Sequence, residues 1–290
     1  MRYHSPLRYP GGKGKLTRFL QRVLDENDLH EIDYAEPYAG GAGVALGLLY
    51  SEYARRIHIN DADRSIFAFW HSILNHTEEF CRQVMTCVLD VDEWRRQRDV
   101  QSEKTHATLL DLGFSTFYLN RTNRSGIVAS GGVIGGLAQA GKWVMDARFN
   151  RAELVSRIRR VASYRSRISL HCLDALDFLA LCAGDLPSRS FAYLDPPYFV
   201  KGQWKLYANY YRSDDHAAVA ETLGACPWPW IVSYDAAPEI LRLYRKHRRL
   251  IYGIDYSAAA RYEGSEVMFF SSDLVIPQVA NPIPVARGVA

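Results

Sequence analysis

The chain has 290 residues, of which 48% are apolar and 23% charged, a composition that is typical of a globular protein and excludes a disordered one. No apolar stretch reaches the about 18 residues that a membrane helix requires, and the N-terminus lacks the apolar core of a signal peptide. Five scattered cysteines and nine histidines show no metal-ligand spacing. We therefore expect a cytoplasmic protein with reduced cysteines, no membrane association and no metal.

Apolar runs of strand length recur along the chain, with helical segments between them. They cover residues 34–38, 56–60, 168–171, 191–194, 230–234, 250–252 and 266–270. Strands that alternate with helices predict an α/β fold with a parallel sheet. The last two runs are close in sequence, which favours an antiparallel hairpin at one edge of that sheet.

The first polar motif is Arg8-Tyr-Pro-Gly-Gly-Lys13, just before the first predicted helix. Tyr9 could cover a bound small molecule, and Lys13 could meet its carboxylate at the helix N-terminus. The alternative is a loop that only caps the helix, and the hexapeptide alone favours this alternative.

A glycine-rich segment, Glu36-Pro-Tyr-Ala-Gly-Gly-Ala-Gly43, joins the first strand to a helix predicted over residues 44–54. Glycines let the backbone approach a ligand, and the helix N-terminus adds N–H donors. The Gly-x-Gly-x-x-Gly spacing of dinucleotide dehydrogenases is not met. Asp61, after the second strand, stands where an acid would hold a ribose hydroxyl pair. Its alternative role is to cap the helix that begins near Arg64.

Residues 64–165 interrupt the alternation of strands and helices. Residues 64–118 are predicted to be helical, and a polar loop over 120–126 and a glycine-rich stretch over 130–136 follow. We expect two domains, a sheet domain formed by residues 1–63 and 166–290 and an inserted, mostly helical domain formed by residues 64–165.

The net charge of +3 is unevenly distributed. Residues 119–167 contain ten Lys or Arg and two acids, which gives this segment +8 and the remainder −5. Such a local excess points to a polyanionic partner. Arg121 and Arg124, in the polar loop, fit this reading, whereas residues 157, 159 and 160 fit a solvated helix face equally well.

Two further acids follow predicted strands. Asp174, after the third strand, would suit the amine of an adenine ring, with the Ala175 amide facing a ring nitrogen. The alternative for Asp174 is a helix cap.

The fourth strand is followed by Asp195-Pro-Pro-Tyr198, at the sheet edge where open α/β folds place their ligands. Two prolines stiffen this turn, so that the Asp195 carboxylate and the Pro196 carbonyl can face one point. Two such acceptors suit the two hydrogens of an exocyclic amine, and Tyr198 offers a face for stacking. The alternative is a rigid turn with a surface tyrosine.

Taken together, segments 9–13, 36–41, 60–61, 174 and 195–198 resemble, in residues and in order, the Dam-like, alpha-group adenine-N6 DNA methyltransferases. The resemblance extends from about residue 5 to residue 272, and residues 117–126 look like the family's conserved loop next to the DNA. Tyr38 stands where Phe is usual, and the glycine-rich stretch 130–136 departs from the family.

This resemblance implies a Rossmann-like methyltransferase sheet with an inserted helical target-recognition domain. The implied reaction transfers a methyl group from S-adenosylmethionine to N6 of a flipped adenine in double-stranded DNA. A cognate restriction endonuclease is a candidate partner, and we expect a monomer.

The resemblance also implies roles for individual residues. The implied catalytic residues are Asp195, Pro196, Pro197 and Tyr198. The implied cofactor-binding residues are Tyr9, Gly12, Lys13, Glu36, Tyr38, Gly40, Gly41, Gly43, Asp61, Asp174 and Ala175. The candidate DNA contacts are Asn120, Arg121, Asn123, Arg124 and Lys201, where the two asparagines have turn-building as their alternative.

Four other functions were weighed. Methyltransferases acting on glutamine or RNA share the fold, but those with amide substrates usually begin the turn with Asn, and cytosine-N4 enzymes more often have Ser there. A non-enzymatic DNA-binding protein is disfavoured because every chemical position is intact. A nicotinamide oxidoreductase lacks its glycine spacing.

Overall fold

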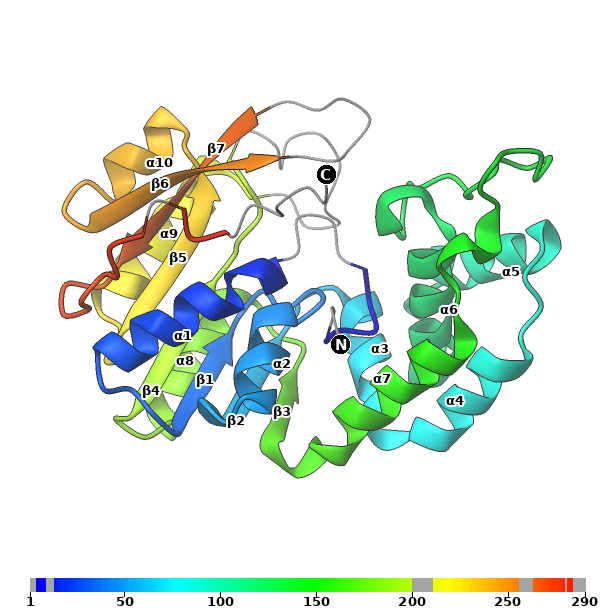
Figure 1. Cartoon of the computed structure of the whole chain (residues 1–290), viewed down its shortest axis with the longest axis horizontal. Coiled ribbons are helices and arrows are strands. Elements are labelled where there is room, and N and C mark those ends of the chain that lie inside the picture. The colour runs from blue at the N-terminus through cyan, green and yellow to red at the C-terminus, as the bar shows by residue number, and fades with distance from the viewer. Residues whose placement is uncertain (1–3, 9–12, 200–210, 256–262, 280, 284–290) are drawn as a thin grey trace, which may run out of the picture.

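The computed structural model describes residues 4–8, 13–199, 211–255, 263–279 and 281–283, and within them a seven-stranded sheet forms the centre of the molecule (Figure 1). The strand order is β3-β2-β1-β4-β5-β7-β6. Strands β1 to β5 pair in parallel, whereas β7 is antiparallel to both β5 and β6. The predicted parallel sheet with an antiparallel hairpin at one edge is thus confirmed. The strands are β1 (Ile32–Glu36), β2 (Ala54–Asn60), β3 (Ile168–His171), β4 (Ser190–Leu194), β5 (Trp230–Asp235), β6 (Arg248–Asp255) and β7 (Glu263–Phe270).

Both faces of the sheet are covered, because its central strands are apolar on both sides. In β4, Phe191 and Tyr193 belong to one hydrophobic cluster, and Ala192 and Leu194 belong to the other. This two-residue alternation is the period of a strand. Helices α1 (Thr17–Glu26) and α2 (Gly43–Tyr50) pack on the first face, and α8 (Ala175–Asp185), α9 (Ser213–Gly224) and α10 (Pro238–Leu243) pack on the second.

The first strand lies two residues earlier than predicted. It ends at Glu36 because Pro37 has no N–H for the ladder, so that Pro37 and Tyr38 begin the glycine-rich loop. The helix after this loop also ends earlier, at Tyr50, since residues from Ala54 onward already pair in β2. The loop is therefore longer on its N-terminal side than the sequence suggested.

The inserted segment is helical, as predicted, and forms a lobe beside the sheet (Figure 1). Gly113 lets two of its helices, α3 and α6, approach closely, since a Cβ there would lie 2.5 Å from the Ala68 carbonyl oxygen. Phe69 and Phe117 stack between the same helices, with ring centroids 6.0 Å apart. The helices are α3 (Arg64–Asn75), α4 (Thr77–Thr86), α5 (Val91–Ser102), α6 (Leu109–Thr122) and α7 (Arg151–Ser163).

Four short 3₁₀ turns complete the described elements: η1 (Lys13–Leu16), η2 (Arg124–Gly126), η3 (Met145–Arg148) and η4 (Arg165–Arg167). The apolar core of the inserted helices is continuous with the core under α1 and α2. The two predicted domains therefore share one hydrophobic cluster, and their boundaries at residues 64 and 165 stay a prediction.

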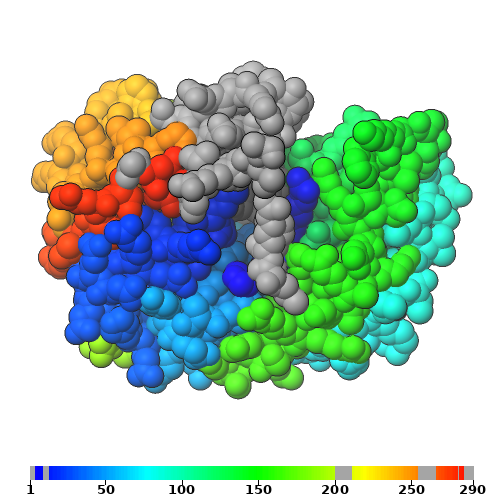
Figure 2. All heavy atoms as spheres, viewed as in Figure 1, coloured from blue at the N-terminus to red at the C-terminus, as the bar shows by residue number. Residues whose placement is uncertain are grey.

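Residues 4–8 connect the two lobes. Arg157 donates to the Ser5 carbonyl at 3.2 Å, and Arg121 donates to the Pro6 carbonyl. Asn120 accepts from the Arg8 amide at 2.7 Å and donates to the Arg8 carbonyl at 2.8 Å. In Figure 2 this blue N-terminal surface is visible next to the green lobe. Within the described ranges, no helix has the length and apolar character needed to cross a bilayer.

Candidate active site

Carboxylates collect at one edge of the sheet, where the parallel strands end. Glu36 is the last residue of β1, Asp61 and Asp195 directly follow β2 and β4, Asp174 follows β3, and Asp235 ends β5. The strand order changes direction between β1 and β4, and this is where open α/β sheets form their ligand crevice. The edge is therefore the expected ligand site, and five carboxylates lie along it.

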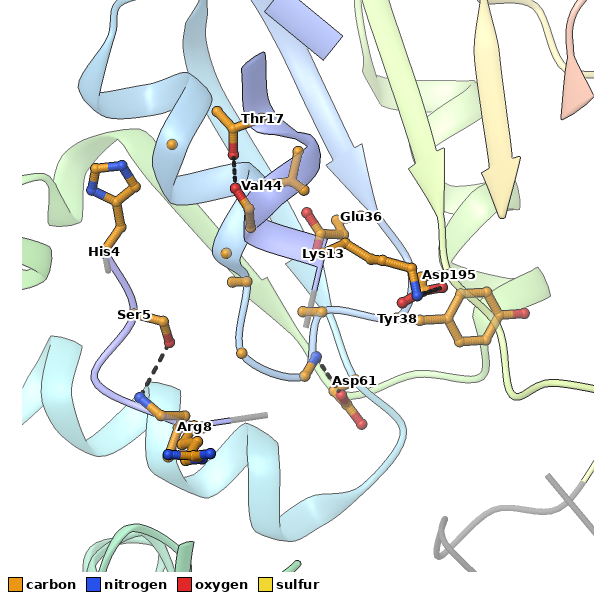
Figure 3. Close-up of a pocket in the computed structure, with 18 of the residues that line it drawn as sticks. His4, Ser5, Arg8, Lys13, Thr17, Glu36, Tyr38, Val44, Asp61 and Asp195 are labelled. Carbon is orange, nitrogen blue, oxygen red and sulfur yellow. Dashed lines mark hydrogen bonds and ion pairs between the residues drawn. The ribbon is translucent and has the colours of Figure 1, made fainter. Parts of the chain in front are cut away.

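The glycine-rich loop is held on both sides by side chains. Asp61 accepts from the Gly40 amide at 2.9 Å (Figure 3), and the Trp70 indole donates to the Gly40 carbonyl at 2.9 Å. Gly40 itself has a φ of 45°, a backbone conformation that glycine adopts with less strain than residues with a side chain. Glu36 accepts from the Ala45 amide at 3.2 Å and so ties the end of β1 to α2. Asp61 does not cap α3, because Asp63 accepts from the Ser65 amide and takes that role.

Gly43 has a packing role as well as a place beside the loop. A Cβ at this position would lie 3.2 Å from the Cα of Gly14, so its absence lets η1 approach the start of α2. This contact brings Lys13, the first residue of η1, next to the end of β4. Because Gly43 has no side chain, the segment around Lys13 and the glycine-rich loop can lie next to each other.

The loop after β3 is fastened by Asn60. This buried side chain donates to the carbonyls of Pro37 and Leu173, both at 3.0 Å, and accepts from the Leu173 amide at 2.9 Å. Asp174 caps α8 by accepting from the Leu176 amide at 2.8 Å, which is the alternative that the sequence left open. The cap uses one oxygen of the Asp174 carboxylate. A contact of this carboxylate with an adenine amine stays a prediction.

Tyr38 packs against a residue far along the chain. Its hydroxyl lies 3.0 Å from that of Tyr211, and the two rings meet edge to face at 6.0 Å. Both tyrosines line the same cavity as the glycine-rich loop.

The turn after β4 is bound by an ion pair. The Lys13 ammonium lies 3.2 Å from a carboxylate oxygen of Asp195 (Figure 3) and 3.4 Å from one of Glu266. It also donates to the Tyr198 hydroxyl, which in turn donates to Glu266 at 2.6 Å. The ammonium of Lys13 thus lies at the Asp195 turn, and its expected contact with the carboxylate of a cofactor stays a prediction.

Three carboxyl groups at this edge have raised pKa values. Burial raises the pKa of Glu36 to about 8, and the charge of Asp195 adds to the effect. Burial raises the pKa of Asp61 to about 7, although the amides of Asp63 and Gly40 oppose it. Burial also raises the pKa of Asp195 to about 6, where Lys13 lowers the value and Glu266 raises it. The shift of Asp195 is the smallest of the three, because the charge and the hydrogen bond of Lys13 oppose the effect of burial.

One cavity of about 1550 Å³ connects these groups. This exceeds the ~300–1,000 Å³ of most small-molecule sites and leaves room for two ligands side by side. Its lining includes most of the sequence-predicted residues: Lys13, Glu36, Tyr38, Gly40, Gly41, Gly43, Asp61, Arg121, Asp174, Ala175, Asp195 and Pro197. Pro196 and Tyr198 are buried beside it and are not part of its lining. Tyr9, Gly12 and Lys201 lie outside the described residues.

The other end of the cavity is basic. Arg8, Arg121, Arg148, Arg157 and Arg160 line it. Burial, followed by repulsion from Arg157 and Arg8, lowers the pKa of Arg121 to about 9, which still leaves it charged at neutral pH. Arg157 is only 7% exposed, so the expectation that it belongs to a solvated helix face was wrong, because it packs inward to bind the Ser5 carbonyl.

The predicted DNA contacts divide into buried and exposed residues. Asn120 holds the backbone of Arg8, and Asn123 accepts from the Trp94 indole at 2.7 Å and donates to the Ile127 carbonyl at 2.8 Å. These bonds match the turn-building alternative, and base contacts by the two asparagines stay a prediction. Arg124 is exposed at the end of α6.

Sequence reasoning did not single out Trp70, Asp235 and Glu266. Asp235 could have been found, because it follows an apolar run as the other acids do. Trp70 lies within a long predicted helix, and Glu266 begins an apolar run rather than ending one. Neither position carries a local signal for its contact.

The arrangement found here, a glycine-rich loop and an Asp-Pro-Pro-Tyr turn on one cavity, has a match among known families. The family model for D12 class N6 adenine-specific DNA methyltransferases matches residues 9–257. The chain belongs to this family. The methyltransferase therefore acts on adenine N6 in DNA, and its family implies S-adenosylmethionine as the methyl donor.

Comparison with solved structures finds more distant likenesses. A protein from Pyrococcus horikoshii described as a candidate RNA methyltransferase is 9% identical over 91% of this chain and 85% of that chain, with a TM-score of 0.43. The rRNA methyltransferase aviRa from Streptomyces viridochromogenes is 13% identical over 89% of this chain and 84% of that chain, with a TM-score of 0.38. No curated protein matches the chain.

The residues of the cavity fit S-adenosylmethionine. This molecule has a ribose diol, an adenine amine and an ammonium group. All three donate hydrogen bonds, and carboxylates can accept them. Glu36, Asp61 and Asp174 supply such acceptors around one cavity. Among the described residues, no three His, Cys, Asp or Glu side chains gather as a metal site would require.

Proposed function

We propose that the turn formed by residues 195–198 binds an adenine that has rotated out of double-stranded DNA, with S-adenosylmethionine in the adjoining part of the same cavity. The observation that carries this proposal is that Asp195 and Pro197 line one cavity together with the loop at residues 38–43. An adenine inside a duplex is out of reach of such a site, and rotating it outward costs a few kcal/mol.

The cofactor would be bound by the acids and glycines of the sheet edge. Asp61 would accept from the ribose hydroxyls, Asp174 and the Ala175 amide would bind the adenine ring, and Glu36 would face the ammonium group. Tyr38 and the backbone at Gly40, Gly41 and Gly43 would enclose it. When bound, the cofactor supplies an electrophilic methyl group. Tyr9, Gly12 and Lys13 keep their implied places nearby as part of this proposal.

The Asp195 turn would activate the adenine amine. The nitrogen lone pair of this amine is delocalised into the ring, which makes the amine a poor nucleophile. Hydrogen bonds from its two hydrogens to the Asp195 carboxylate and the Pro196 carbonyl would pull the nitrogen toward tetrahedral geometry and localise the pair. Asp195 needs only to be ionised, since the proton becomes acidic after the methyl group has been transferred. Its pKa of about 6 leaves it ionised above neutral pH.

Tyr198 would support the base by stacking, which is worth ~1–3 kcal/mol per base. In the described conformation it is 7% exposed and the Lys13 ammonium lies 4.8 Å from its ring centroid. Stacking would therefore require Lys13 to move or the base to use the other face of the ring.

The DNA backbone would cross the basic end of the cavity. Arg8, Arg121, Arg148 and Arg160 line this end, and Arg124, three residues after Arg121, is exposed. Phosphate contacts of this kind fix the position of a duplex, and base contacts then select the sequence. We also propose that the enzyme works as a monomer and that a restriction endonuclease of the same specificity accompanies it.

The test is Asp195→Ala. We expect transfer of labelled methyl groups to DNA to be abolished, because one of the two acceptors for the amine is gone, while DNA affinity measured by fluorescence anisotropy stays within about twofold. Asp185→Ala, at the exposed end of α8, is the matched control and should keep full activity. Substantial methylation by Asp195→Ala would defeat the assignment.

The recognised sequence and the partners need separate measurements. Methylation-sensitive sequencing of DNA from cells that express the protein should yield one modified adenine motif. Size-exclusion chromatography with light scattering tests the monomer, and a nuclease that cuts only the unmodified motif would support the proposed companion enzyme.

A further inference from the structure

Glu266 lies at the start of the β7 segment that pairs with β5, and it faces the Asp195 turn. It is in register with Asp235, the last residue of β5. Only 1% of Glu266 is exposed, yet its carboxylate accepts from the Tyr198 hydroxyl at 2.6 Å and from the Tyr252 hydroxyl at 3.0 Å, and it lies 3.4 Å from the Lys13 ammonium. Glu266 belongs to none of the motifs that define the site.

A carboxylate with so little solvent is costly unless a cation and hydrogen bonds compensate its charge. Among the described residues, two of the groups that compensate Glu266 also touch the turn after β4. Lys13 lies 3.2 Å from Asp195, and Tyr198 is the aromatic residue of the turn itself. The buried charge is therefore connected to the turn rather than to an isolated part of the core.

We propose that Glu266 is a positioning residue for adenine methylation. Through the Tyr198 hydroxyl it fixes the ring on which the target base stacks, and through Lys13 it fixes the ammonium beside Asp195. This inference rests on the proposed function, and it adds Glu266 of β7 to the residues that the sequence motifs supply.

Asp235 holds the same turn from the backbone side. Its carboxylate accepts from the Phe199 amide at 2.9 Å, one residue beyond Tyr198. Asp235 and Glu266 lie opposite each other on neighbouring strands. Asp235 binds the backbone of the turn, and Glu266 binds the Tyr198 side chain. A turn held at two points can keep its acceptors oriented before the base arrives, which is the positioning that methyl transfer requires.

The charge of Glu266 also reaches Asp195. It raises the pKa of Asp195, whereas Lys13 lowers it. Within the part of the chain that the structure describes, the titratable groups around this pair include Tyr34 and Glu36 on β1, Tyr193 on β4, Tyr198 in the turn and Tyr252 on β6. Neutralising Glu266 should therefore let Asp195 ionise at lower pH, an effect that loss of packing alone would not produce.

The experiment compares Glu266→Gln with the matched exposed substitution Glu239→Gln on α10. We expect Glu266→Gln to lower kcat by roughly 10- to 100-fold, the factor that corresponds to one charged hydrogen bond. The KM for S-adenosylmethionine should stay within about twofold, and the acidic limb of the pH–rate profile should move to lower pH. Glu239→Gln should leave kcat, KM and the profile unchanged.

A second variant, Tyr198→Phe, keeps the ring and removes only the hydroxyl that Glu266 accepts. If Glu266 acts through Tyr198, the loss of kcat in Tyr198→Phe/Glu266→Gln is smaller than the product of the two single losses, as expected for coupled residues. Independent, multiplying effects would overturn the Tyr198 part of the proposal. Should Glu266→Gln fail to fold, Tyr198→Phe decides alone, and a wild-type kcat in that variant overturns the proposal.

Failure of this inference is distinguishable from failure of the proposed function. If Asp195→Ala is inactive while Glu266→Gln has the kcat and pH profile of the wild type, only the positioning role is wrong. If Asp195→Ala is active, the proposed function itself is wrong.

Discussion

At the scale of single residues, the site combines several carboxyl groups whose folded-state pKa values are raised by burial. Glu36, Asp61 and Asp195 reach about 8, 7 and 6. The folded protein therefore holds more protons than the unfolded chain in the range below these values. Stability that is present at low pH is lost as the pH rises through each folded pKa. The site should be more stable in mildly acidic solution than at its working pH.

The Glu36→Gln variant tests whether stability falls as the pH rises. Between pH 4.5 and about 8 the folded carboxyl keeps its proton while the carboxyl of the unfolded chain ionises, which lowers the free energy of unfolding across this range by of the order of a few kcal/mol. Gln keeps an acceptor for the Ala45 amide but does not ionise. Thermal unfolding at pH 5 and pH 8 should thus show a smaller fall in Tm for Glu36→Gln than for the wild type. An equal fall in both proteins would contradict the raised pKa of Glu36.

From the raised pKa of Asp61 we expect that binding of the cofactor releases a proton. A carboxylate that accepts from ribose hydroxyls prefers the ionised form, so binding should lower its pKa from about 7. Affinity for S-adenosylmethionine should then rise about tenfold between pH 6 and pH 8. Titration calorimetry at pH 7 in two buffers of different ionisation enthalpy measures the released proton. Asp61→Asn should bind more weakly and lose most of this pH dependence, and an unchanged dependence would exclude Asp61 as its source.

At the scale of elements, the glycine-rich loop is braced by a helix of the inserted lobe. Trp70 on α3 donates a hydrogen bond to the carbonyl of Gly40, and Asp61 accepts one from the backbone amide of the same residue. Asn60, at the end of β2, holds the loops after β1 and β3 to each other. The loop conformation therefore depends on three different elements, and changes in α3 should reach the cofactor site.

Trp70→Phe is the corresponding prediction. It keeps an aromatic ring in the core and removes one indole hydrogen bond, which should destabilise the fold by about 1 kcal/mol and weaken S-adenosylmethionine binding severalfold. Trp94→Phe is a matched control, because the Trp94 indole makes a similar buried bond to Asn123, away from the loop. Both variants should lower Tm, but only Trp70→Phe should change the cofactor Kd measured by calorimetry. A Kd shift of the same size in both would show a general stability effect.

The sequence predicted the elements that are defined by local patterns and missed contacts between distant segments. All seven strands overlap their predicted runs, because apolar residues flanked by turn residues mark a buried strand wherever it pairs. Asp61, Asp174 and Asp195 were found because they follow such runs, whereas Asp235, which also follows one, was missed. The contact of Tyr198 with Glu266 spans 68 positions and that of Lys13 with Tyr198 spans 185, so only the folded register of β5 and β7 and the approach of η1 to α2 bring them together.

Charge counting was similarly limited. The excess of arginine between residues 119 and 167 was visible in the sequence, but not which side chains turn inward. Arg157 is buried against residues 4–8, whereas Arg159 is exposed and pairs with Glu78 at 2.6 Å. Both lie on α7, but Arg157 is among the buried residues of that helix and also pairs with Glu153.

At the scale of the whole molecule, the arginines that line the cavity come from the N-terminal segment and the inserted lobe, while the acids Glu36, Asp61 and Asp195 line it at the sheet edge (Figure 3). A cavity that is basic at one end and acidic at the other can receive the phosphates of a polyanion and the donor groups of a base and a cofactor. The near-neutral net charge of +3 therefore hides a strongly polarised site.

Arg124→Ala tests whether this polarity serves DNA binding. Arg124 is exposed just beyond Asn120 and Arg121, which hold residues 4–8 beside the cavity, so we expect it to neutralise one phosphate. Each such contact contributes about 0.9 to the slope of log affinity against log salt. Fluorescence anisotropy over a series of salt concentrations should then give Arg124→Ala a slope shallower by about one and a weaker affinity at low salt. Arg159→Ala removes an equally exposed charge that pairs with Glu78, and its slope should equal that of the wild type. If the two variants behaved alike, the salt dependence would reflect net charge alone, and Arg124 would not belong to the DNA interface.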